Sequence, residues 1–160
     1  MKVIRVTEEW QRAGVHYVRT EGMVKDFSLT LEGEFEADTP ESLYVLALAG
    51  NLPVSTCRLK IVDTSDASDG SGESGELVGK IERVGKIERV ATIPDYRSQG
   101  IGSLVIDEAE KWLKELGAKK VLINSRKAAV RFYEKLGYKP DWNKTSGSGL
   151  FECVETEKVL

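Results

Sequence analysis

Apolar and polar positions follow two different periods along this chain, and their succession predicts a mixed α+β fold. Alternating or continuous apolar positions predict strands over 1–6, 42–49, 54–62, 86–93, 120–124, 138–142 and 150–160. Apolar residues at i, i+3, i+4 spacing predict helices over 8–25, 104–116 and 126–136. With 160 residues, 41% of them hydrophobic, the chain has the size of one domain with one core, and we assign 1–160 to it.

The stretch Val90–Gly102 (VATIPDYRSQGIG) joins a predicted strand directly to a predicted helix. Pro94 ends the β-branched run, because proline continues neither a sheet ladder nor a helix interior. Two glycines, Gly100 and Gly102, then precede the helical period. A turn of this kind presents unpaired backbone N–H groups at the positive end of a helix dipole. The stretch therefore predicts an anion site, with phosphate as the best candidate.

The glycine turn differs from two common phosphate-binding loops. No Gly-Lys-Ser/Thr follows the glycines, which excludes a P-loop, and Val105 occupies the third glycine position of the dinucleotide fingerprint. The run Arg97–Gly102 (RSQGIG) instead resembles the acetyl-CoA loop, Q/R-x-x-G-x-G/A, of the GNAT N-acetyltransferase superfamily. A plain strand–helix turn that uses glycine for tight packing is the alternative interpretation.

A second stretch, Ala129–Tyr138 (AVRFYEKLGY), resembles the other signature of this superfamily, an aromatic pair followed by E-K-L-G-Y/F. YVRTEGMVKDF and IERV look most like the ElaA/YjcF-like branch. The resemblance implies a three-layer fold, with a mostly antiparallel twisted sheet of roughly six to seven strands flanked by about four helices. It also implies a cytoplasmic enzyme that transfers acetyl from acetyl-CoA to a primary amine by direct attack in a ternary complex. A catalytically weak acyl-CoA-binding module or sensor on the same fold is the alternative.

The resemblance assigns the coenzyme to the loop and to the strand before it. Backbone N–H groups of the loop would hold the pyrophosphate, namely those of Ser98, Gln99, Gly100, Ile101, Gly102 and Ser103. Val90, Ala91 and Thr92 would pair with the pantetheine arm like an added strand, and one of their N–H groups would polarise the thioester carbonyl. Arg97 either pairs with a phosphate or is a solvated turn residue.

Two side chains are candidates for the acid–base steps. Tyr133 matches the family's tyrosine near the departing sulfur, where a phenol, protonated at neutral pH, can protonate the thiolate. Its alternative role is a core aromatic beside Phe132, although we expect Tyr133 to face the cleft. Glu88 matches a strand glutamate that several members use as a base, directly or through a water. A strand glutamate paired with a lysine or arginine is the alternative.

Three further residues have no assigned role. The family often has asparagine at the position of Arg126, where it touches the coenzyme arm, and here Asn124 lies two residues earlier. The asparagine role therefore transfers to neither residue, and either could contribute. Cys153 is interpreted as a buried structural thiol in preference to a group near the acyl chain.

Three segments leave alternatives open. GKIERV occurs in tandem at 79–84 and 85–90, and this even period is compatible with a longer strand, a bulge or two near-degenerate registers. We place the copy at 85–90 in the site, because its distance to Arg97 is fixed. The acidic segment 28–40 is interpreted as a solvated connection or short helix, with an acidic lip for a cationic acceptor as the alternative. Residues 63–76 predict a flexible surface loop between two strands.

Composition limits the classes of molecule that this protein is expected to bind. The net charge is −3, and no long lysine/arginine cluster indicates a nucleic acid, nor does any apolar stretch reach membrane length. Two cysteines without metal spacing and one histidine predict no metal site and favour a reducing cytoplasm. The predicted partners are acetyl-CoA and a small-molecule or peptide amine. Pairing of free edge strands would also allow a homodimer.

Overall fold

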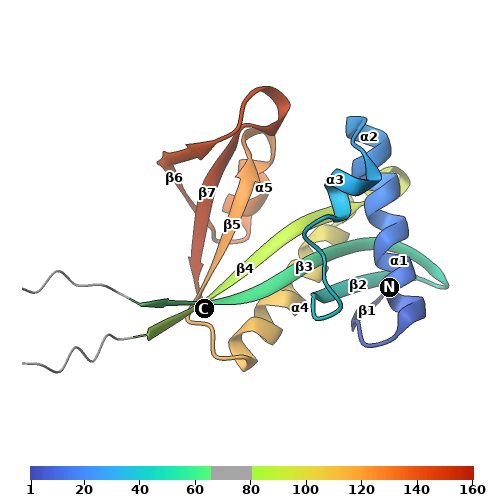
Figure 1. Cartoon of the computed structure of the whole chain (residues 1–160), viewed down its shortest axis with the longest axis horizontal. Helices are drawn as coiled ribbons and strands as arrows, with labels where there is room; N and C mark the ends of the chain where they lie inside the picture. The colour runs from blue at the N-terminus through green and yellow to red at the C-terminus, as the bar shows by residue number, and fades with distance from the viewer. Residues whose placement is uncertain (66–80) are drawn as a thin grey trace, which may run out of the picture.

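The computed structural model describes residues 1–65 and 81–160, and in these ranges a seven-stranded sheet forms the centre of the molecule (Figure 1). The strands are β1 (Lys2–Arg5), β2 (Leu43–Ala49), β3 (Leu52–Ser65), β4 (Ile81–Thr92), β5 (Lys120–Arg126), β6 (Lys139–Ser146) and β7 (Cys153–Val159). Their order across the sheet is β1-β2-β3-β4-β5-β7-β6. Every neighbouring pair is antiparallel except the parallel pair β4–β5. The predicted mixed, mostly antiparallel sheet is confirmed.

Helices cover both faces of the sheet. They are α1 (Glu9–Arg19), which continues through a π-helical turn (Thr20–Val24) into α2 (Lys25–Phe27), then α3 (Leu31–Phe35), α4 (Ile101–Glu115) and α5 (Val130–Lys135). Gly14 of α1 packs against Leu46 of β2, while the Cys57 thiol of β3 lies 3.7 Å from the Val105 carbonyl of α4. The five central residues of β2 are all buried, as expected for a strand covered from both sides. The predicted three layers are therefore confirmed.

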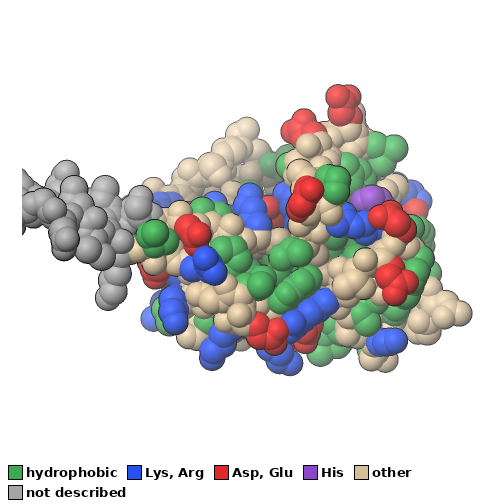
Figure 2. All heavy atoms as spheres, turned by 60° about the horizontal axis from the view of Figure 1, so that its bottom comes forward, with side chains coloured by type: hydrophobic (Ala, Val, Ile, Leu, Met, Phe, Trp, Pro, Cys, Tyr) green, Lys and Arg blue, Asp and Glu red, His purple; other side chains and the backbone are tan. Residues whose placement is uncertain are grey.

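The core lies between the sheet and the two long helices. Val15 and Val18 on one side and Val105 and Leu113 on the other are fully buried, and each such side chain stabilises the fold by about 1.5–3 kcal/mol. A Cβ on Gly85 would stand 2.8 Å from Leu113 Cδ1, so α4 packs directly on the backbone of β4. On the face shown in Figure 2, charged side chains of both signs are interspersed with apolar ones.

The tandem repeat lengthens β4. The strand includes Ile81–Val84 of the first copy and the whole second copy, and it pairs with β3 from Ile81 to Glu88. The register then shifts, so that Cys57 of β3 lies opposite both Arg89 and Val90. Arg89 has a φ of +51°, as expected for an extra residue that bends a strand. A longer strand and a bulge are thus both present.

Strands β4 and β5 separate toward their C-terminal ends, as Figure 1 shows. They pair only over Val84–Lys86 and Lys120–Leu122, although β4 continues to Thr92 and β5 to Arg126. A V-shaped opening therefore lies in the middle of the sheet, flanked by the second copy of the repeat.

Some predicted boundaries need correction. Arg126 is the last residue of β5 and does not begin a helix, because the β5–β7 ladder extends to the pair Arg126–Cys153. The strand predicted to end at 142 continues to Ser146. Segment 28–40 contains the short helix α3, but Glu34 within it is buried, so the segment is not simply solvated. Residues 63–65, predicted as the start of a surface loop, belong to β3, because they pair with β4, and the rest of that predicted loop lies outside the described residues.

Candidate active site

The start of α4 presents free backbone donors. Gly100 has a φ of +77°, a left-handed conformation that glycine adopts without strain, and the helix begins at Ile101. No side chain in the described ranges caps this helix, and its first turn carries no acidic residue. A Cβ on Gly102 would stand 3.4 Å from the Phe132 ring and 3.8 Å from Thr92 Oγ1. The donors therefore lie beside the end of β4 and beside α5.

Arg97 fixes the loop against the helix on the other face. Its Nε donates to the Thr92 carbonyl at 3.0 Å, and its Nη2 donates to the Gly22 carbonyl at 3.3 Å. The guanidinium also pairs with Asp26 at 2.5 Å. Arg97 is thus bound to the protein at three points, and its pairing with a phosphate stays a prediction.

Two of the three strand residues predicted to hold the pantetheine arm turn their backbone toward the opening. The Ile93 N–H donates to the Val54 carbonyl at 2.9 Å, so by strand alternation Ala91 also faces β3. Val90 and Thr92 therefore point away from β3, into the gap left by β5. Because the Thr92 carbonyl accepts from Arg97, the groups that this alternation leaves for a ligand are the Thr92 N–H and the Val90 carbonyl, and the Val90 N–H follows the bulge residue Arg89.

A cleft of about 560 Å³ occupies the opening between β4 and β5. The residues that line it include Glu88, Val90, Asn124, Arg126, Tyr133 and Cys153. Both candidate acid–base residues therefore lie on one cavity, together with the strand edge and the residues whose roles the sequence left open.

Tyr133 combines the two interpretations made from the sequence. Its ring lies edge-to-face with Phe132 at 5.0 Å and with Tyr138 at 6.0 Å, and only 7% of the residue is exposed. Its hydroxyl has no hydrogen-bond partner in the described part of the chain, and it borders the cleft. Burial raises the pKa of Tyr133, so the phenol is protonated at neutral pH. It can therefore donate a proton, and its role as the acid stays a prediction.

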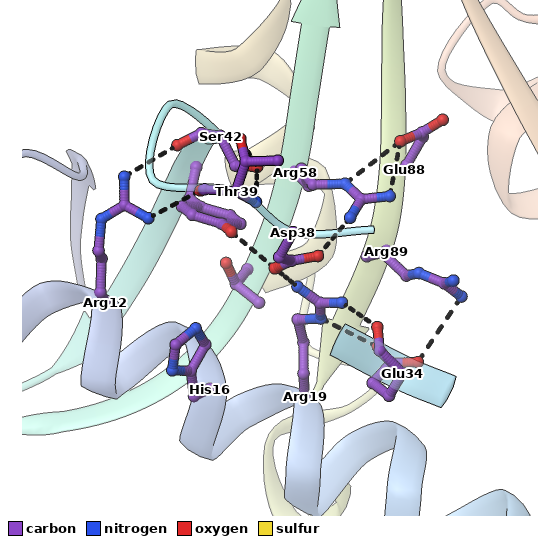
Figure 3. A network of polar contacts seen from close by, with 12 residues as sticks. Arg12, His16, Arg19, Glu34, Asp38, Thr39, Ser42, Arg58, Glu88 and Arg89 are labelled. Carbon is purple, nitrogen blue, oxygen red and sulfur yellow. Dashed lines mark hydrogen bonds and ion pairs between the residues drawn. The ribbon is translucent and has the colours of Figure 1, made fainter. Parts of the chain in front are cut away.

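Glu88 is already paired with two cations. Its Oε2 accepts from Arg58 Nη2 at 2.9 Å, and its Oε1 lies 3.0 Å from Lys60 Nζ (Figure 3 shows the Arg58 contact). Burial acts to raise the pKa of Glu88, but hydrogen bonds from Lys60 and Arg58 outweigh it, and the net effect lowers the pKa. The geometry matches the alternative of a paired strand glutamate, and a role as base stays a prediction.

A network of ion pairs extends from Glu88 into the protein (Figure 3). Arg58 also bonds to Asp38, which bonds in turn to Arg19. Arg19 Nε donates to Glu34 Oε1 at 2.9 Å, and the side chains of Arg19 and Glu34 are fully buried. Sequence reasoning missed this network, because its members come from α1, α3, the connection between α3 and β2, β3 and β4. The two acids Glu34 and Asp38 turn inward, so they do not form the acidic lip considered for segment 28–40.

The residues without an assigned role lie at the mouth of the cleft. The Arg126 guanidinium stacks 4.4 Å above the Phe27 ring, and Phe27 lies edge-to-face with Phe151 at 5.7 Å. Asn124 Nδ2 is 3.5 Å from Ser146 Oγ. Cys153 is only partly buried, and burial raises the pKa of its thiol. The end of α2 and the β6–β7 connection therefore meet over Arg126.

Residues 4–138 match the model of the acetyltransferase (GNAT) family. The chain therefore belongs to the GNAT family, as its two signatures predicted. Within 1–65 and 81–160, no helix is long and apolar enough to cross a membrane, and no group of three or more His, Cys, Asp or Glu side chains is placed to hold a metal ion.

Individual relatives agree with this assignment. The uncharacterized N-acetyltransferase YjcF of Bacillus subtilis (strain 168) is 28% identical over 139 residues, covering 87% of this chain and 86% of YjcF. A candidate N-acetyltransferase from Lactobacillus plantarum has a crystal structure with a TM-score of 0.78 and 26% identity, covering 99% of this chain and 97% of that one.

Two other solved structures share the fold at lower identity. Escherichia coli ElaA has a TM-score of 0.70 at 13% identity, with 98% of both chains covered. The PaiA N-acetyltransferase of Thermoplasma acidophilum, solved in complex with coenzyme A, has a TM-score of 0.67 at 17% identity over 100% of both chains. The predicted resemblance to ElaA and YjcF is confirmed.

Proposed function

We propose that this protein is an acetyl-CoA-dependent N-acetyltransferase that acts on a primary amine by direct attack in a ternary complex. The observation that carries the proposal is the parting of β4 and β5 beside the uncapped start of α4. An unpaired strand edge suits the amides of pantetheine, and clustered N–H groups suit a pyrophosphate. The coenzyme A complex of the Thermoplasma relative supports this choice of ligand.

The residues around the cleft supply the steps of acyl transfer. The Val90 N–H would polarise the thioester carbonyl, as an oxyanion donor does. The amine nitrogen attacks that carbon, and its proton passes through a water to Glu88. The C–S bond then breaks, and the departing thiolate takes the hydroxyl proton of Tyr133. The raised pKa means that the phenol carries its proton at neutral pH when the thiolate forms.

One observation favours the second candidate, a binding module with weak turnover. Glu88 is held by Arg58 and Lys60, and its lowered pKa makes its carboxylate a weak base. In a module of this kind the coenzyme would bind, but the amine would keep its proton.

Calorimetric titration with coenzyme A and a thiol-release assay with a panel of amines test the proposal. Gly100→Val imposes a side chain at a φ of +77°, and the resulting strain should weaken coenzyme binding about tenfold. Gly50→Val is the matched control, because Gly50 has a φ of +61° in the β2–β3 hairpin, with open space around it. It should leave coenzyme affinity unchanged.

The outcomes separate the two candidates. Absence of heat at millimolar coenzyme A would refute both. Binding without thiol release for any amine would establish the module. Thiol release that slows in Tyr133→Phe, with coenzyme affinity retained, would establish the transferase.

A further inference from the structure

Arg126 lies on the acceptor side of the opening. Along β5, Val121, Ile123 and Ser125 are buried, whereas the alternate residues up to Arg126 are less so. Arg126 stacks on Phe27, at the end of the helix that begins as α1. That helix covers the sheet face opposite to α4, whose start offers the phosphate donors. Arg126 is therefore placed away from the predicted pyrophosphate site but on the same cleft as Tyr133.

The guanidinium of Arg126 keeps its donors free. It makes no hydrogen bond or ion pair with any residue in 1–65 or 81–160, and stacking on an aromatic face leaves its N–H groups available at the edges. Arg89, on the β4 bulge, also lines the cleft. Within the part of the chain that the structure describes, its one ionic contact is Glu34 Oε2 at 3.6 Å, which is too long for a hydrogen bond (Figure 3).

The carboxylates on the cleft are already committed to other cations. Glu88 is bound by Arg58 and Lys60, and Glu34 is bound through Oε1 by the buried Arg19. Three arginines line the cavity: Arg58 is bound by Glu88 and Asp38, and Arg89 has the long contact with Glu34, whereas Arg126 has no ionic partner among the described residues. A cationic group of an acceptor would find Glu88 already paired, and Glu34 Oε2 buried with Arg89 3.6 Å away.

We propose that the acceptor amine of this enzyme also carries an anionic group, which Arg126 and Arg89 bind at the mouth of the cleft. The inference rests on the proposed function, which it deepens by naming the acceptor class. A carboxylate or a phosphate monoester would accept paired hydrogen bonds from a planar guanidinium. The anionic group of the acceptor is held by the arginines, while the amine of the acceptor reaches the thioester carbon between Val90 and Glu88.

Matched amines that differ only in charge test this inference. The set is 4-aminobutanoate, its neutral amide and 1,4-diaminobutane, with O-phosphoethanolamine and ethanolamine to separate phosphate from carboxylate. The anionic member of a set should have a kcat/KM about ten- to a hundredfold above its neutral partner, as one or two charge-assisted bonds allow. Calorimetry of the same compounds, with and without coenzyme A, measures the preference without turnover.

Arg126→Gln and Arg89→Gln test the residues. Each should reduce the ratio of kcat/KM for the anionic amine to that for the neutral amine toward one. The kcat/KM for the neutral amine and the affinity for the coenzyme should change by less than about twofold. Arg131→Gln is the control, because Arg131 is an exposed arginine of α5 that does not line the cleft. It should keep the full preference.

The failures of the two proposals are distinguishable. Equal or better use of the amide and the diamine would overturn the inference and leave the transferase standing. The inference would also be overturned if the preference for the anion persisted in both variants. The same holds if Arg126→Gln weakened coenzyme affinity and left the acceptor preference unchanged. Absence of turnover with every amine would refute the transferase, and calorimetry would still decide whether the cleft selects anions.

Discussion

The two copies of GKIERV have the same sequence but different surroundings. Glu82 in the first copy has a side chain that is 38% exposed, and its contact with Lys120 Nζ is 3.8 Å long. Glu88 in the second copy is hydrogen-bonded to Arg58, which belongs to the buried network. Arg83 pairs with the exposed Asp63, whereas Arg89 adopts a positive φ and faces Glu34.

This difference follows from what lies beside each copy. The first copy extends β4 away from the opening, where the strand pairs with β3 and the start of β5, and where Arg83 donates to the Leu116 carbonyl at the end of α4. The second copy borders the opening and lies under segment 28–40 and α1. A local sequence therefore acquires a candidate role in this protein through its tertiary neighbours, and the following predictions test that conclusion.

The largest expected effect is on stability. Arg19→Met removes the buried partner of Glu34 and Asp38 behind the second copy, and should lower the free energy of unfolding by about 3–5 kcal/mol. Arg83→Met in the first copy removes a half-exposed ion pair with Asp63 and an exposed hydrogen bond to the Leu116 carbonyl, and should cost about 1–2 kcal/mol. Urea unfolding followed by circular dichroism measures both. Equal losses would contradict the contrast between the two copies.

The next effect is on catalysis. Glu88→Gln removes the proposed base and should lower kcat/KM about 100-fold, the lower end of what a general base contributes. Glu82→Gln makes the same change at the equivalent position of the first copy and should alter kcat/KM less than about twofold. Steady-state thiol release compares the two variants. A larger loss in Glu82→Gln would show that the site has been assigned to the wrong copy.

The smallest effect is expected when one copy is deleted. Removing either copy produces the same sequence. In it Val78 takes the place of Val84, and the remaining copy occupies the position of the second copy. Because six is an even number, every side chain of β4 keeps its face. Coenzyme affinity should stay within about twofold, and stability within about 1 kcal/mol, because the lost contacts are mostly exposed.

A deletion of five residues, 80–84, is the control for that experiment. It places Gly79 at the position of the buried Val84, and because five is an odd number, the side chains that precede this position turn to the opposite face of the sheet. The free energy of unfolding should therefore fall by about 2 kcal/mol more than in the six-residue deletion. Equal free energies of unfolding for the two deletion variants, measured in urea, would show that packing of the Val84 side chain does not stabilise the fold.

Much of the fold could be predicted from local patterns. The apolar periods located the seven strands, and the Gly100–Gly102 turn located the start of α4. The family was readable from two short signatures, because each encodes a local conformation with a defined chemistry. Boundaries near Arg126 and Trp142 were wrong, since pairing with β7 extends both strands further than their own composition indicates.

By itself, therefore, the sequence determined the elements, the family and the residue types available to the site. Only the tertiary structure decided that β4 and β5 part after Lys86 and that Ala91 faces β3. It also decided that Glu88 is paired, while the Arg126 guanidinium makes no hydrogen bond or ion pair with another described side chain. These features depend on contacts between residues far apart in the chain. A local pattern carries no information on which distant side chain will neutralise a charge or leave it available to a ligand.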